Sequence, residues 1–257
     1  MALDIIQPST TAVARELRAA VERVAAAFRS ADPAGPTALD WDVRTLAGHL
    51  ATGIEGYLHM LRGEPSHLDV FETRNEAGNA ALAAEAGTPF EDLVERLEKG
   101  IAAFAAELEQ LDGADEVRFY STPLPAGAIG GIFLAELLVH GWDLAKVAIP
   151  AEAAALAAPC SFAVLPLLVK PGQPEQATLG FKLRGHGGLR VKLDGMAVEL
   201  LPLDGPADVK LSADPVAFIL TTYGRQSPAR GMLTGKVIAY GRKPWRMSAI
   251  QSRFDTA

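Results

Sequence analysis

Apolar residues recur at spacings of three and four through the first half of the chain, which is the period of an amphipathic helix. Over residues 11–29 the pattern places Val13, Leu17, Val21, Val24 and Phe28 on one stripe. Such stripes predict four main helices, over residues 11–29, about 43–62, 89–108 and 128–147. A shorter helix is predicted around residues 74–85. Proline and glycine within residues 112–127 predict a loop.

The pattern changes after residue 150. A helix is predicted over residues 151–169, and the period then shifts from about four to two, which is typical of strands. The predicted strands are 178–184, 189–194, 196–203, 207–211 and 236–240, and the predicted helices are 214–224 and 243–254. The sequence therefore predicts an α+β protein, with a four-helix bundle over residues 1–150 and a smaller α+β unit with an antiparallel sheet over residues 151–257.

Charge divides the chain at the same place. The 257 residues carry a net charge of −7, but residues 1–150 alone carry −12 and residues 151–257 carry +5. The acidic total argues against a nucleic-acid partner, which needs a basic footprint. We expect no membrane span, because no uninterrupted apolar run approaches 20 residues. We also expect a cytoplasmic location, because the start of the chain lacks the features of a secretory signal.

The strongest local signal for chemistry is Glu136 followed four residues later by His140, within an apolar helical stretch. Residues four apart lie on one face of a helix. A carboxylate and an imidazole buried together need partners, and a divalent metal would satisfy both. The alternative is that the two side chains bond to each other or to another helix.

His49 adds a third candidate ligand, also on a mostly apolar helix. Gly48 and Gly53 beside it permit a close approach of helices. Side chains from facing helices commonly hold a metal in a bundle core. His49, Glu136 and His140 would leave a coordination position open, which is the pattern of a catalytic zinc site. Each histidine taken alone is also compatible with an ordinary core position, and the ligand types suit zinc, nickel or iron.

These segments resemble a known family. The stretch from Trp41 to His49, together with the Glu136–His140 stretch that continues to Asp143, is similar to the mycothiol-dependent maleylpyruvate isomerase family. The resemblance implies a DinB-like metal-binding bundle followed by a sterol-carrier-protein-like domain. It implies that His49, Glu136 and His140 bind a divalent metal, which is usually zinc. It also implies that mycothiol, or another low-molecular-weight thiol, is the cosubstrate.

The resemblance extends to three further residues. Arg225 corresponds to an arginine used in catalysis, and its guanidinium can bind a carboxylate or stabilise an enolate. A salt bridge at a helix end is the alternative for Arg225. Arg74 matches a family arginine in the connection after the second helix, where it would bind substrate or form a surface ion pair. Asp143, three residues after His140, would support a metal ligand or cap the helix.

The predicted function is attack of a metal-activated thiolate on a small, anionic electrophile, at a site between the two units. Either cis–trans isomerisation or S-transfer would follow. Cys160 lies outside the metal motif and is predicted to be a small core residue. A non-catalytic carrier of lipid or another hydrophobic molecule is the alternative, with a cavity around Phe162, Phe181 and Phe218. The sequence leaves open whether the protein is a monomer or a homodimer.

Overall fold

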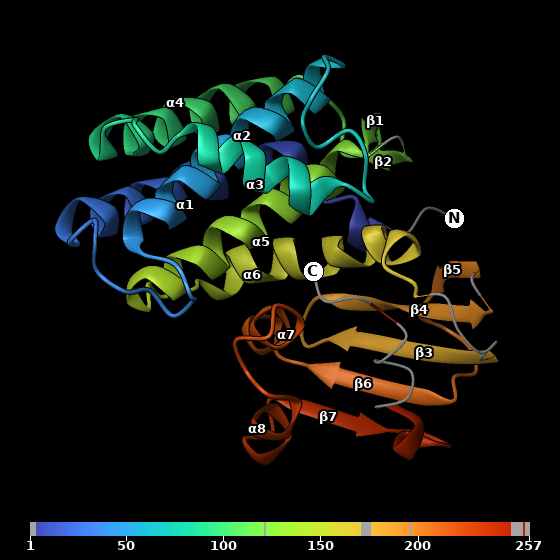
Figure 1. The fold of residues 1–257 in the computed structure, drawn as a ribbon. Coiled ribbons are helices and arrows are strands. Elements are labelled where there is room, and N and C mark those ends of the chain that lie inside the picture. The colour runs from blue at the N-terminus through green and yellow to red at the C-terminus, as the bar shows by residue number, and fades with distance from the viewer. Residues whose placement is uncertain (1–3, 121, 171–175, 196, 248–253, 255–257) are drawn as a thin grey trace. The chain divides into compact units, whose positions relative to one another are not determined.

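The computed structural model describes residues 4–120, 122–170, 176–195, 197–247 and 254. The chain separates into two compact units, Pro8–Ile149 and Pro150–Ala257 with Met1–Gln7 (Figure 1). The short helix η1 (Asp4–Ile6) thus groups with the second unit, whereas the sequence pattern placed it in the bundle. Tertiary packing decides this, because Ile6 is buried and η1 contacts β4 and η2 of the second unit.

Helices that pack side by side form the first unit (Figure 1). Their bounds are α1 (Thr10–Ser30), α2 (Val43–Arg62), α3 (Arg74–Ala84), α4 (Phe90–Leu108) and α5 (Ala126–Ala145). α1 packs against α4 and α5, and α2 packs against α4, α5 and the short α3. The helices predicted within residues 1–150 are all present, with ends shifted by at most two residues. Phe28, Leu50, Leu97, Ile101 and Phe104 are among the fully buried side chains of this core.

Local signals fix the ends of α2, the helix that carries His49. The side chain of Asp42 accepts a hydrogen bond of 2.7 Å from the backbone N–H of Thr45, which satisfies one of the free amides of the first turn. Gly63 ends the helix with a φ of 70°, a conformation that glycine adopts without strain. α2 therefore begins and ends where the sequence predicted.

α5 is apolar on nearly every face and mostly buried, as expected for a core helix. Its length and composition would allow it to cross a membrane, but the buried core helix of a bundle meets the same criteria. The segment before it contradicts the predicted loop over 112–127. β1 (Glu116–Phe119) and β2 (Thr122–Pro125) form an antiparallel hairpin. Val117, Phe119 and Leu124 are its buried positions, and they anchor the hairpin on the bundle.

The second unit is built on a mixed sheet, so the α+β class is confirmed. The strands are β3 (Gln176–Leu183), β4 (Gly187–Asp194), β5 (Ala197–Pro202), β6 (Val209–Ala213) and β7 (Val237–Tyr240). Their order is β5-β4-β3-β6-β7. Every pairing is antiparallel except that of β3 with β6. After β5 the chain crosses to the other side of β3, where β6 pairs with β3 in parallel. Arg190 donates hydrogen bonds to the carbonyls of Pro202 and Pro206 in this connection.

The helices of the second unit depart from the prediction in three places. The helix expected over 151–169 is α6 (Ala151–Ala157) followed by the 3-10 segment η2 (Ala158–Leu167), where Pro159 and Pro166 interrupt regular hydrogen bonding. α7 (Pro215–Thr222) matches the prediction, and α8 (Pro228–Leu233) was not predicted. Only η3 (Pro244–Arg246) appears at the start of the predicted 243–254 helix, and residues 248–253 lie outside the described part.

Candidate metal centre

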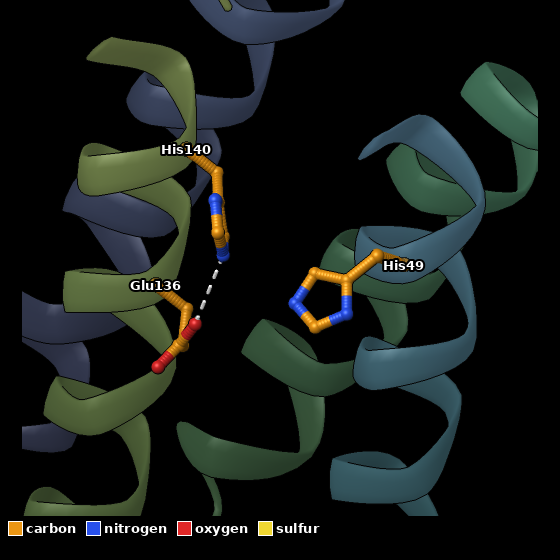
Figure 2. A group of neighbouring side chains, drawn as sticks. All are labelled: His49, Glu136 and His140. Atoms are coloured by element: carbon orange, nitrogen blue, oxygen red, sulfur yellow. Dashed lines mark ion pairs between the residues drawn. The ribbon is translucent and has the colours of Figure 1, made fainter. Parts of the chain in front are cut away.

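Two helices of the bundle bring the predicted ligands together. Glu136 and His140 lie one turn apart on α5, and His49 faces them from α2 (Figure 2). The Nε2 atom of His140 is 3.3 Å from Oε2 of Glu136. One donor atom from each of the three residues lies within 4.8 Å of the other two. Residues separated by almost 90 positions in sequence thus form one cluster.

The donor set fits a divalent metal. Ligands bonded at about 2.0–2.1 Å in a tetrahedron lie roughly 3.3–3.4 Å apart, which is close to the His140–Glu136 separation. Two imidazoles and one carboxylate are ligands that zinc and several other divalent metals accept. Glu136 and His49 are partly exposed, so a ligand can reach the cluster, whereas His140 is buried.

Asp143 sets the orientation of His140. Its Oδ2 atom lies 3.1 Å from Nδ1 of His140, so that Nε2 points toward Glu136 and His49. Burial, the largest influence, acts to lower the pKa of His140, but the hydrogen bonds to Asp143 and Glu136 and their charges outweigh it and raise the pKa. One imidazole between two carboxylates is therefore a strongly cation-attracting arrangement.

Trp41 lies against both histidines. Its ring centroid is 5.0 Å from that of His49 and 6.4 Å from that of His140, and the two imidazole centroids are 5.0 Å apart. The turn that carries Trp41 is tied to α5 by a 3.0 Å hydrogen bond from the N–H of Ala38 to the carbonyl of Asp143. The rings thus restrict the rotation of both imidazoles.

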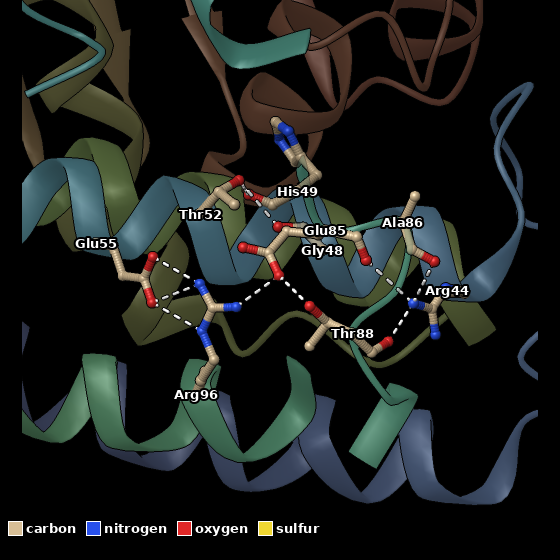
Figure 3. Close-up of polar contacts among 9 residues, drawn as sticks. All are labelled: Arg44, Gly48, His49, Thr52, Glu55, Glu85, Ala86, Thr88 and Arg96. Carbon is tan, nitrogen blue, oxygen red and sulfur yellow. Dashed lines mark hydrogen bonds and ion pairs between the residues drawn. The ribbon is translucent and has the colours of Figure 1, made fainter. Parts of the chain in front are cut away.

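A polar network attaches the end of α3 to α2 beside His49 (Figure 3). Arg96 of α4 binds Glu55 of α2 at 2.8 Å and Glu85 at 2.7 Å, and Glu85 also accepts a 2.7 Å hydrogen bond from the hydroxyl of Thr88. The hydrogen bond to Arg96 is the main reason that the pKa of Glu85 is lowered. Arg44 donates to backbone carbonyls of the same α3–α4 connection. The network holds α3 at a fixed position along α2.

Small residues let α3 approach the helix that carries His49. A Cβ atom added at Gly48 would lie only 2.8 Å from Cδ1 of Leu82 in α3, so a larger residue there would require the end of the Leu82 side chain to shift. Gly53, one turn after His49, has more room, because an added Cβ would meet only Phe133 at 3.7 Å. The two glycines that the sequence pointed to therefore have different roles.

Tyr120 is a residue of this region that the sequence analysis missed. It follows β1 in the hairpin, with a φ of 47° that non-glycine residues rarely adopt. Burial, followed by the negative charge of Glu136, raises the pKa of Tyr120 to about 12, and Arg74 acts in the opposite direction. No motif in the sequence signals this position, because only the hairpin brings Tyr120 to the cluster.

The family described as mycothiol maleylpyruvate isomerase N-terminal domain matches residues 10–145, which is more than half of the chain. The chain belongs to this family. Among the curated proteins, none matches the sequence.

Two solved structures of a member of this family share the fold. One is a crystal structure of the mycothiol-dependent maleylpyruvate isomerase, with 16% identity and a TM-score of 0.56 over 87% of this chain and 92% of that one. The other is a variant of that isomerase in which a histidine is replaced by alanine, with 15% identity, a TM-score of 0.56, and coverage of 91% and 94%. At this identity the similarity shows the fold and no more.

Membership of the mycothiol maleylpyruvate isomerase family does not by itself assign roles to the remaining residues. Arg225 lies in the second unit, after α7, where it donates a hydrogen bond to the carbonyl of Tyr223. Cys160 is fully buried, and burial raises the pKa of its thiol. His59, His67 and His186 do not belong to the cluster among the described residues. Phe162, Phe181 and Phe218 pack on one another, with ring centroids 4.8 to 6.4 Å apart.

Proposed function

We propose that this chain is an enzyme that uses mycothiol, or another low-molecular-weight thiol, to isomerise a small anionic electrophile with a conjugated cis double bond. The observation that carries the proposal is the convergence of His49, Glu136 and His140, whose donor atoms lie within 4.8 Å of one another. Membership of the mycothiol maleylpyruvate isomerase family supports the thiol and the reaction class.

In this proposal His49, Glu136 and His140 hold a divalent metal, for which we favour zinc. A metal bound there would supply a Lewis acid that makes a thiol deprotonate at neutral pH, whereas a free thiol has a pKa near 8.5. Asp143 keeps the proton on Nδ1 of His140, so that Nε2 carries the lone pair needed for coordination. Trp41 packs on both imidazoles and keeps water from one side of them.

The reaction needs a thiol from outside the chain. Cys160 is the single cysteine, it is fully buried, and its raised pKa keeps it protonated. The sulfur of the external thiol would form a bond to one alkene carbon, and the π electrons would move onto the conjugated carbonyl oxygen as an enolate. Rotation would follow about the carbon–carbon bond that was double and is now single. The enolate electrons would then re-form that double bond in the trans geometry as the carbon–sulfur bond breaks and the thiolate leaves. Arg225 is proposed to stabilise the enolate.

An S-transferase would use the same first step but retain the carbon–sulfur bond. The metal ligands determine the nucleophile and leave the fate of the adduct open, so this reaction is the second candidate. Recovered product separates the two, because isomerisation returns the free thiol and transfer consumes it.

The test combines metal content with turnover. Purified wild-type protein should hold about one divalent metal per chain, while His49→Ala and His140→Ala should lose it. His59→Ala is the matched control, because its side chain lies on the same helix but is 45% exposed and outside the cluster. Wild-type protein should convert maleylpyruvate only when the thiol is present. Full metal content in His49→Ala, or no thiol-dependent turnover by wild type, would refute the proposal.

A further inference from the structure

Arg74 has an ordered guanidinium without an acidic partner among the described residues. Its Nη1 donates a 2.8 Å hydrogen bond to the carbonyl of Phe71, and its Cζ lies 3.7 Å from the centre of the Phe71 ring. By contrast, Arg18, Arg62 and Arg96 of the same unit each bind a carboxylate. A guanidinium has five N–H groups, so most of those on Arg74 remain available to a ligand.

Tyr120 offers a second donor that no described residue uses. Its ring packs on Phe119 and Phe71, with centroids 4.4 and 5.2 Å away, but no hydrogen bond to its hydroxyl occurs among the described residues. The backbone at Tyr120 adopts a positive φ, which the two-residue turn between Phe119 and Thr122 favours, so the hairpin holds the side chain in one place. The hairpin therefore presents a phenol whose hydroxyl has no hydrogen-bond partner within the described part of the chain.

Phe71 places the two donors next to each other. One of its faces lies under the Arg74 guanidinium, and its ring meets the Tyr120 ring nearly edge-on, at 85°. The charges of both Arg74 and Glu136 act on the Tyr120 hydroxyl, so these groups lie in one region. The hydroxyl keeps its proton at neutral pH, because the pKa of Tyr120 is about 12. Neither donor is bonded to a carboxylate among the residues that the structure describes, so the two form a suitable pair for an anion.

We propose that Arg74 and Tyr120 form an anion-binding subsite beside the His49–Glu136–His140 cluster, and that this subsite binds a carboxylate of the small electrophile. A guanidinium and a phenol both donate hydrogen bonds, and a carboxylate accepts two in one plane. The identity of the ligand rests on the proposed function. The donor pair itself rests only on the geometry of Arg74, Phe71 and Tyr120.

Equilibrium binding of maleate, a small cis-dicarboxylate, tests the subsite without turnover. Titration calorimetry should be carried out on both metal-loaded and metal-free protein. Tyr120→Phe keeps the packed ring and removes only the hydroxyl, and we expect maleate to bind about 10-fold more weakly. Arg74→Met keeps much of the apolar stem, and we expect a loss of about 100-fold. Arg62→Met and Tyr240→Phe are matched controls and should bind maleate as wild type does.

Dimethyl maleate, the uncharged ester, provides the comparison of charge. Its affinity should change much less than that of maleate in Tyr120→Phe and Arg74→Met, since its ester carbonyls accept hydrogen bonds but carry no charge. If Arg74→Met does not fold, Tyr120→Phe alone decides the question. Maleate binding that is unchanged in Tyr120→Phe would overturn the subsite, and so would a wild-type protein that does not bind maleate. Failure of the proposed function would instead appear as wild-type protein that holds no metal or shows no thiol-dependent turnover. The maleate titration of metal-free protein would still test the subsite in that case.

Discussion

Replacing Asp143 by asparagine should weaken metal binding without unfolding the bundle. Asp143 is 2% exposed, and its Oδ2 lies 3.1 Å from Nδ1 of His140. An asparagine oxygen can still accept a hydrogen bond from Nδ1, but the negative charge that makes the imidazole a better ligand is lost. Loss of such a supporting group typically lowers metal affinity about 10- to 100-fold. That range equals about 1.4–2.7 kcal/mol, close to the roughly 1.5–3 kcal/mol of a hydrogen bond to a charged group.

The assay is competition for zinc between the protein and a chromogenic chelator of known affinity. Asp143→Asn should lose about one to two orders of magnitude in affinity, and Asp143→Ala should lose more because it also removes the acceptor. Asp208→Asn is a matched control, since Asp208 pairs with Lys243 in the second unit. Thermal denaturation of the metal-free proteins should establish that each variant is folded. Zinc affinity in Asp143→Asn equal to that of wild type would show that the carboxylate does not support a ligand.

Three further predictions concern the bundle and the cysteine. The lowered pKa of Glu85 means that its ion pair with Arg96 stabilises the fold above the ordinary pKa of 4.5 and loses that effect as the pH falls below it. Glu85→Gln should therefore cost about 1–2 kcal/mol at pH 7 and little at pH 3, as urea denaturation would reveal; an equal cost at both pH values would contradict this. Gly53→Ala should raise stability by up to about 1 kcal/mol through helix propensity, whereas Gly48→Ala should lower stability or gain nothing because it displaces Leu82. Their thermal midpoints should thus move apart, and a common shift would count against the role of Gly48. Cys160 should not react with a disulfide reagent in the native protein and should react once in guanidinium, since its thiol is buried; rapid native reaction would disprove this.

Periodicity was sufficient to locate most elements of the bundle. The stripe from Val13 to Phe28 is fully buried or nearly so, and α2 has the predicted bounds because Asp42 and Gly63 are local signals. The hairpin of β1 and β2 was missed, since its strands are four residues long and the proline-containing sequence resembles a loop. The parallel pairing of β3 with β6 could not be predicted either. It depends on the path of the chain after β5, which no local pattern specifies.

The sequence by itself determined the helical bundle, the α+β class, the family and the candidate ligands His49, Glu136 and His140. The bundle and the fold class follow from local period, and the candidate ligands from residue types in two short segments. The family follows from the resemblance of those segments to known members. Only the tertiary structure decided that the donor atoms of the three ligands come within 4.8 Å of one another, and that Tyr120 packs on Phe71, the ring that the Arg74 guanidinium covers. Such contacts join segments far apart in the chain, so they depend on how helices and the hairpin pack, and packing is a property of the whole unit.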